Sequence, residues 1–142
     1  MSEFTIRPIV PDDVAFVVNA WLEGYWPDCP CSLVMPKSVW WPRWHRVIEN
    51  ILADERTRTV VACLPDDQTQ LLGFACARPP SVLHWCYVKQ AFRHNGIAAG
   101  MLAELEGLSC VSHASAATAR AFRRNELGDF IYDPRLLKEY QP

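Results

Sequence analysis

Two segments in the N-terminal half carry apolar residues at the spacing of a helix that buries one face. The first follows Asp12 and Asp13, which suit a helix start, and its apolar positions are Val14, Val17, Val18, Trp21, Leu22 and Tyr25. The second has charge on one face and, on the other, Trp40, Trp44, Val47 and Ile51. Glycine and prolines interrupt the stretch between them, so we expect an irregular loop over residues 24–36.

From Thr59 the hydrophobic period changes to that of strands. The runs "TVVACL" and "LLGFACAR" are separated by the turn-forming "PDDQTQ", which predicts a hairpin. The next run, "SVLHWCYV", is apolar on both alternating faces, as is typical of a central strand covered on both sides. Regular alternation along this strand predicts one shared face for Val82, His84, Cys86 and Val88.

Shorter segments complete the predicted order of elements. A strand at residues 4–7 comes first, and a helix over residues 96–106 follows the third strand-like run. Then come a strand in "LSCVSHA", a helix in "SAATARAFRRNEL" and a short strand in "DFIYD". The order β-α-α-β-β-β-α-β-α-β, without a repeat or linker, predicts a single mixed α/β (α+β) domain over residues 1–142.

Composition narrows the class of protein. The 142 residues are 50% hydrophobic and 21% charged, which is typical of a globular domain with a real core. The net charge of −2 gives no reason to expect non-specific nucleic-acid binding. No apolar run approaches the roughly 18 residues of a membrane-spanning helix. The start "MSEFTIRPIV" does not have the pattern of a secretory signal, so we expect a cytoplasmic protein without a membrane partner.

Six cysteines are present, and four of them lie within apolar strand-like runs, where a free cysteine acts as a small buried hydrophobe. Only Cys29 and Cys31, in "DCPCS", lie in a predicted loop. We expect no disulfide framework. We also expect no metal site, because no second pair matches these two cysteines.

The stretch "FRHNGIAAGML", residues 92–102, marks the junction of a strand and a helix. A glycine here lets the backbone approach a ligand closely, and the first N–H groups of a helix have no internal partner. With the helix dipole, they form a site that favours phosphate, to which Arg93 and His94 add donors. The alternative is an ordinary helix start whose small residues serve tight packing.

The longer stretch from Val88 to Leu102 resembles the acetyl-CoA signature of the GNAT superfamily of N-acetyltransferases. Arg93, Gly96 and Ala98 occupy the motif positions, and Val88 occupies the apolar strand end before them. "LLGFACAR" also resembles the family's third strand, in which a glycine follows an aliphatic pair. The order of elements matches over nearly the whole chain. The resemblance implies one GNAT-like domain with a twisted, mixed but mostly antiparallel sheet and helices on both faces.

The resemblance also implies acetyl-CoA as the acyl donor and assigns residues to it. Its pyrophosphate would lie on backbone N–H groups of Arg93, His94, Asn95, Gly96, Ile97 and Ala98. Its pantetheine arm would add to the edge where the fourth and fifth strands diverge, along the backbone of Cys86, Tyr87 and Val88. Lys89 and Arg93 could add charge near the phosphates or be solvated.

Attack by an amine requires a group that takes up its proton. His84 is the first candidate, and a histidine at this point is similar to one proposed as base in arylalkylamine N-acetyltransferases. The alternative is a core histidine that bonds a backbone carbonyl. His113 is the second candidate, although a surface loop position is equally compatible with its sequence context. His94 and His45 are weaker candidates.

The family often has a tyrosine on its last long helix that protonates the departing thiolate, whereas this chain has Phe122 in that segment. Tyr132, Tyr87 or a water could substitute, or the thiolate could leave unassisted. The run Arg120, Arg123 and Arg124 suits a solvated helix face or a contact with the adenine-side phosphate.

The acceptor site of this fold is built largely between the first two strands. This region is rich in aromatic and thiol side chains: Tyr25, Trp26, Cys29, Cys31, Trp40, Trp41 and Trp44. Aromatic faces suit a flat or cationic acceptor. The alternatives are that the tryptophans are core residues, or an interface of a homodimer.

Two main hypotheses follow. The first is an enzyme that transfers acetyl from acetyl-CoA to a primary amine by direct attack. The second is a non-catalytic binding module of the same fold that acts through a Trp-rich surface. A third, an accessory or virus-encoded acetyltransferase that modifies a host protein or nucleobase, has no support in particular residues. The acceptor and the oligomeric state are left open.

Overall fold

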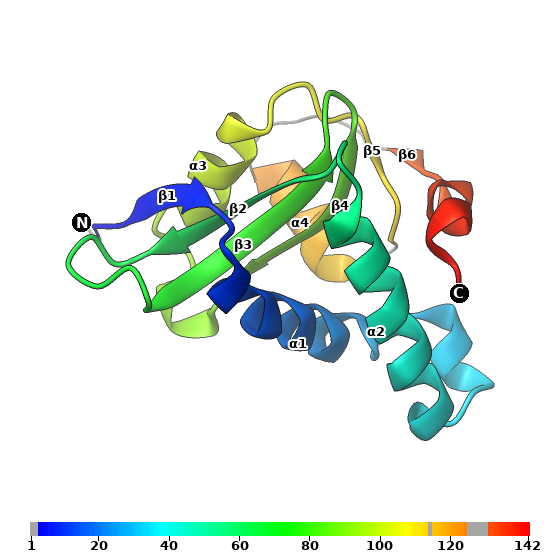
Figure 1. Ribbon diagram of the computed structural model, residues 1–142. Helices are drawn as coiled ribbons and strands as arrows, with labels where there is room; N and C mark the ends of the chain where they lie inside the picture. Colours follow the sequence, from blue (N-terminus) through cyan, green and yellow to red (C-terminus); the bar gives the residue numbers. More distant parts are fainter. Residues whose placement is uncertain (1–2, 114, 125–130) are drawn as a thin grey trace.

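The computed structural model describes residues 3–113, 115–124 and 131–142 (Figure 1). Its strands are β1 (Thr5–Pro8), β2 (Arg58–Cys63), β3 (Leu71–Arg78), β4 (Val82–Val88), β5 (Cys110–Val111) and β6 (Ile131–Tyr132). Its α-helices are α1 (Val14–Tyr25), α2 (Lys37–Ala53), α3 (Ile97–Glu104) and α4 (Ala116–Arg124). Short 3-10 helices are η1 (Pro11–Asp13), η2 (Pro30–Leu33), η3 (Gln90–Phe92) and η4 (Pro134–Tyr140). The order predicted from the sequence is confirmed.

One six-stranded sheet runs in the order β1-β2-β3-β4-β5-β6. The pairs from β1 to β4 are antiparallel, whereas β4–β5 and β5–β6 are parallel. β5 is much shorter than the predicted strand and pairs with β4 only at Val82 and Leu83. The predicted mixed, mostly antiparallel sheet is therefore confirmed, and its parallel part is short.

Helices cover both faces of the sheet, as expected (Figure 1). The helical stripes of α1 and α2 pack with Val61, Phe74 and Trp85 in one core. α3 packs on the opposite face, in a second core that includes Ala75, Leu83 and Cys86. The irregular loop predicted over residues 24–36 contains one helical turn, η2. No helix among the described residues is long and apolar enough to cross a membrane.

The expected alternation along β4 is wrong at one residue. Cys76 of β3 faces Trp85, but the next residue, Ala77, faces Leu83, so His84 is an extra residue in β4. Such a bulge leaves the extra residue unpaired and shifts the side-chain alternation. Leu83 and Cys86 therefore belong to the α3 side, while the ring of His84 lies 5.9 Å from that of Tyr140, on the α1–α2 side.

The C-terminal helix η4 was not predicted, and it closes the sheet's α1–α2 side near His84. The hydroxyl of Tyr140 donates to Asp54 at the end of α2, and Asn50 Nδ2 donates to the Tyr140 carbonyl at 3.0 Å. Glu139 accepts from Arg56 at 2.8 Å and from Arg78 at 2.7 Å. These contacts join residues far apart in the sequence, which explains why local patterns did not reveal η4.

We expect Gly73→Ala to destabilise the fold. A Cβ at this position of β3 would lie 2.3 Å from the backbone oxygen of Tyr87, and backbone cannot move aside as a flexible side chain can. The free energy of unfolding should fall by about 1–3 kcal/mol, the usual range for overpacking. Urea unfolding followed by circular dichroism measures this change. A variant as stable as the parent would contradict the close approach of β3 and β4.

Candidate active site

The candidate site begins where β4 and β5 diverge. Their last paired residues are Leu83 and Val111, and beyond them β4 continues for five residues while β5 ends. On its other side β4 stays paired with β3 as far as Val88. We call this divergence the fork. Within the described ranges, it leaves the β5-facing edge of β4 without a strand partner along Cys86, Tyr87 and Val88, the residues assigned to the pantetheine arm.

The far end of β4 leads into the glycine loop, residues 93–98. Arg93 Nε donates to the Val88 carbonyl at 2.9 Å, and Asn95 Nδ2 donates to the Phe92 carbonyl at 3.2 Å. Gly96 has φ +80°, a left-handed conformation that glycine adopts most readily, and a Cβ there would meet nothing within 4 Å. His94 also has a positive φ, 68°. The loop is thus held by its own side chains and offers open space above Gly96.

Helix α3 starts directly after this glycine. Its first internal bond runs from the N–H of Gly100 to the Gly96 carbonyl, at 3.0 Å. The N–H groups of Ile97, Ala98 and Ala99 precede that bond and have no intrahelical acceptor. With the positive end of the helix dipole, they suit an anionic ligand.

The two basic side chains near this loop make other contacts. Lys89 Nζ lies 5.1 Å from the centre of the Phe16 ring, a cation–π contact with α1. Arg93 uses Nε to fix the loop to Val88. Arg120 and Arg123 lie on an exposed part of α4, whereas the side chain of Arg124 lies outside the described part of the structure.

Both candidate histidines lie at the fork and are fully buried. His84 Nδ1 is 2.6 Å from Ser112 Oγ, and the same Oγ is 2.8 Å from His113 Nδ1. His84 therefore bonds a hydroxyl rather than a backbone carbonyl, and His113 is a core residue rather than part of a surface loop. The structure brings together two histidines that the sequence treated separately.

Burial keeps both imidazoles neutral. Desolvation, reinforced by the charge of Arg78, lowers the pKa of His84 to about 4, although Asp54 and Glu139 act in the opposite direction. Desolvation, with a smaller effect of His84, also lowers the pKa of His113 well below its ordinary value. The Nε2 atoms of both rings are buried and have no hydrogen-bond partner among the described residues.

Aromatic rings surround His113. Their centres lie 4.7 to 5.8 Å from its own, and we call this group the aromatic shell: Trp21, Tyr25, Trp44 and Trp85. The indole N–H groups of its three tryptophans are buried and, within the described part of the chain, lack acceptors. The shell excludes water from His113 and lines it with aromatic faces and unused donors.

The aromatic residues between the first two strands are mostly inside the protein. Trp40 and Trp44 are buried in the α1–α2 core, so the expectation that they form an interface is wrong for these two residues. Both residues lie on the apolar face of α2, which packs against α1. Trp26 and Trp41 are half-buried, and Lys37 Nζ lies 6.0 and 5.0 Å from their ring centres. Cys29 and Cys31 are free thiols.

Of the tyrosines considered as proton donors, Tyr132 pairs with Val111 of β5, next to Ser112 and His113, whereas Tyr87 lies further along β4. Tyr132 is on β6 and is 41% exposed, and its pKa is raised by partial burial and by Cys29 and Cys31. Tyr87 packs beside Phe16 and Phe74 on the α1 side. The side chain of Phe122 lies outside the described part of the structure.

Sequence reasoning missed Ser112 and Tyr140. Ser112 precedes His113 directly in "VSHA", so a hydroxyl beside a candidate histidine was a usable signal. Tyr140, whose ring packs edge-to-face on His84, is 56 positions away in the chain and gave no local signal.

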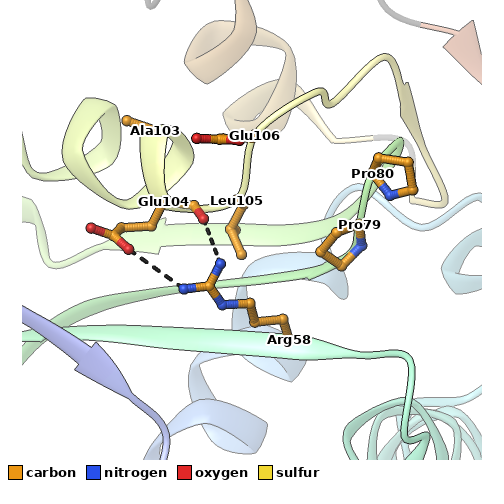
Figure 2. A pocket seen from close by; sticks show the side chains of 7 residues that line it. All are labelled: Arg58, Pro79, Pro80, Ala103, Glu104, Leu105 and Glu106. Atoms are coloured by element: carbon orange, nitrogen blue, oxygen red, sulfur yellow. Dashed lines mark hydrogen bonds and ion pairs between the residues drawn. The ribbon is translucent and has the colours of Figure 1, made fainter.

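A pocket of about 490 Å³ lies at the other end of α3 from the glycine loop (Figure 2). Arg58 donates from Nη1 to the Glu104 carbonyl at 2.7 Å, and its Nη2 lies 3.5 Å from the Glu104 carboxylate. Pro79 and Pro80 form the opposite wall. Arg58 thus caps the end of α3 there, and none of the proposed site residues lines this pocket.

Stability should fall between pH 6.5 and 4. In this range unfolded histidine is protonated, whereas folded His84, with its pKa of about 4, is not, so the unfolded chain binds more protons. His84 alone should remove roughly 3 kcal/mol over this range. Urea unfolding at pH 7, 6, 5 and 4.5 measures the slope, which should be shallower in His84→Gln. Equal slopes in both proteins would contradict the burial of a neutral His84.

Comparison with protein-family models gives no match for this chain, and comparison with curated proteins also gives none. Solved structures do resemble it. A protein from Pyrococcus furiosus assigned as an acetyl transferase has a TM-score of 0.68 at 13% identity, over 92% of this chain and 95% of that chain. A predicted acetyltransferase from Clostridium acetobutylicum, solved with acetyl-CoA, has a TM-score of 0.58 at 18% identity, over 92% of each chain.

A GCN5-related N-acetyltransferase from Rhodopseudomonas palustris has a TM-score of 0.54 at 18% identity, over 87% of this chain and 81% of that chain. These likenesses extend over nearly the whole chain, while the sequences have diverged widely. They therefore establish the architecture: the chain has the fold of the GNAT N-acetyltransferases.

Proposed function

We propose that this protein transfers an acetyl group from acetyl-CoA to a primary amine by direct attack of the amine on the thioester. The observation that carries the proposal is the course of β4. This strand has a buried histidine at the fork, an unpaired edge along residues 86–88, and the glycine loop at its far end. Acetyl-CoA has an extended pantetheine arm that matches the unpaired edge, followed by a pyrophosphate that matches the glycine loop.

The described residues fit acetyl-CoA. The β5-facing edge along Cys86, Tyr87 and Val88 can bond the amide groups of the pantetheine arm as an added strand would, although the Val88 carbonyl already accepts from Arg93 Nε. The N–H groups of residues 95–98 can bond the pyrophosphate, and the open space at Gly96 leaves room for it, whereas the N–H of Arg93 already donates to the Gln90 carbonyl at 3.3 Å. A solved structural neighbour of this chain contains acetyl-CoA, which supports the same donor here.

The chemistry needs a proton acceptor rather than a nucleophile from the protein. The amine nitrogen forms a bond to the thioester carbon, the carbon–sulfur bond then breaks, and the nitrogen gives up a proton. His84 and His113 are neutral and have Nε2 atoms unpartnered within the described chain, so we propose them as the proton acceptors. Tyr132 is our candidate donor to the departing thiolate, because it pairs with Val111 beside the histidine pair and a tyrosine phenol is protonated at neutral pH.

The aromatic shell supports a flat or cationic amine as the acceptor. The alternative of a binding module with a Trp-rich surface gains no support, since most tryptophans are buried. Among the described residues, the exposed large apolar side chains are Val10, Leu33, Val34, Val39, Ile131 and Tyr132.

Calorimetric titration tests the glycine loop directly. We expect the parent to bind acetyl-CoA and Gly96→Glu to bind it at least about tenfold more weakly, because a carboxylate would face the pyrophosphate. Ala103→Glu is the matched control, since it adds the same charge to an exposed position in the last turn of the same helix. Equal losses in both variants, or no binding by a folded parent, would contradict the proposed donor site.

Thiol release from acetyl-CoA with a panel of primary amines tests the histidines. We expect His84→Gln and His113→Gln each to lower kcat about 100-fold at pH 7. Part of this loss should be recovered near pH 10, where the amine is unprotonated without help. His45→Gln is the control, because the side chain of His45 on α2 is 43% exposed and pairs with Glu49.

The pH profile of the parent provides a further check. Because the pKa of His84 is lowered to about 4, its imidazole is already neutral at pH 5.5–7, and no break should occur near 6.5. A clear break there, removed by His84→Gln, would contradict the buried neutral state.

A further inference from the structure

We propose that Ser112 couples His84 and His113 into one proton relay, in which the serine hydroxyl passes a proton between the two imidazoles. This inference rests on the proposed function for its role in catalysis. Its physical basis, however, is the arrangement of three side chains and can be measured without any substrate.

The geometry places one hydroxyl between two ring nitrogens. Ser112 Oγ lies 2.6 Å from His84 Nδ1 and 2.8 Å from His113 Nδ1, and all three residues are fully buried. A serine hydroxyl has one proton and two lone pairs, and the relay uses the arrangement in which it donates to one Nδ1 and accepts an N–H from the other. Two neutral histidines bonded in this way must therefore hold opposite tautomers.

Opposite tautomers also set the protonation of the two Nε2 atoms. The ring that donates from Nδ1 has an unprotonated Nε2, and the other ring has a protonated Nε2. Both Nε2 atoms are buried and have no partner among the residues described. The pair thus presents one acceptor and one donor, and their roles exchange when the serine proton moves.

The surroundings give the relay a direction. His113 lies within the aromatic shell contributed by α1, α2 and β4, on the side proposed for the acceptor. His84 lies beside Tyr140 of η4 and senses the charges of Arg78, Asp54 and Glu139. The side chain of Glu139, whose charge acts on His84, is 46% exposed, whereas His84 itself is fully buried, and we place the exit of the proton at this end. Tyr25 is the titratable group that faces His113 from α1.

The transfer balances as follows. His113 Nε2 takes a proton from the attacking amine, His113 Nδ1 gives its proton to Ser112 Oγ, and Ser112 gives its own proton to His84 Nδ1. His84 then gives the proton on Nε2 to a water molecule. Each ring has exchanged its tautomer and no net charge is left in the buried site. After product release the reverse transfer restores the starting state: His84 Nε2 takes a proton from water, and His113 Nε2 gives its proton to water that enters the emptied acceptor site.

This arrangement answers a difficulty that burial creates. A single buried imidazole with a strongly lowered pKa holds a proton poorly, because the charged ring has lost its hydration. A relay needs neither ring to stay charged, since the proton gained at one end leaves at the other. Ser112 is therefore a positioning and relay residue rather than one that touches substrate.

Nuclear magnetic resonance of the 15N-histidine-labelled full chain, without ligand at pH 7, tests the coupling. We expect His84 and His113 to appear as neutral rings of opposite tautomer, assigned by the loss of one ring's signals in His84→Gln. In Ser112→Ala the Nδ1–H tautomer should disappear, because its acceptor is gone. Ser109→Ala, at an exposed serine just before β5, should leave both rings unchanged. Equal tautomers in the parent, or opposite tautomers that persist in Ser112→Ala, overturn the relay.

Kinetics with an accepted amine tests the catalytic role. Ser112→Ala should lower kcat about 100-fold with an unchanged KM for acetyl-CoA, and Ser112→Thr, which keeps the hydroxyl, should recover at least tenfold. The solvent isotope effect of the parent should show more than one proton in transfer, and that of Ser112→Ala a single one. An unchanged kcat in Ser112→Ala overturns the relay. If the folded parent acetylates no amine, the proposed function fails, and the tautomers still decide whether the coupling exists.

Discussion

The bulge in β4 is the constraint on which the rest of the site depends. One residue more in β4 than in β3 leaves His84 outside the ladder and turns its ring to the same side as Trp85. A bulge also increases the local twist of its strand. β4 leaves β5 at this same point, after Leu83, and its β5-facing edge then runs unpaired toward the glycine loop. One irregularity therefore sets both the position of the buried histidine and the start of the edge proposed for the donor.

The polar groups at the fork are stable only as a set. A buried imidazole without hydrogen bonds is unfavourable, and a charged one more so. Ser112 partners both Nδ1 atoms at 2.6 and 2.8 Å, while the aromatic shell keeps water away and both rings neutral. Trp21, Trp44 and Trp85 are buried and pack around His113. The burial of Trp21, Trp40, Trp44 and Trp85 leaves only the half-buried Trp26 and Trp41 for a surface that would bind partners through tryptophan.

The C-terminal segment completes the enclosure of His84. Exposed ion pairs such as those of Glu139 contribute little one by one. Here, however, they act with the Tyr140 hydroxyl, which donates to Asp54, and with the Asn50 amide, which holds the Tyr140 carbonyl. Together they hold an aromatic ring against His84 from residues that come after the last strand. The site is therefore assembled from the whole length of the chain.

The sequence by itself determined the order of elements, the helical stripes of α1 and α2, the glycine loop and the resemblance to GNAT enzymes. These features are local: periodicity, a glycine before a helix and a short motif are set by neighbouring residues. Tertiary structure alone decided the bulge at His84, the shortness of β5, the Ser112 bridge and the place of η4. Each of these depends on which residues meet across the sheet, and a pairing shift of one residue leaves no mark in the hydrophobic pattern of a strand buried on both faces.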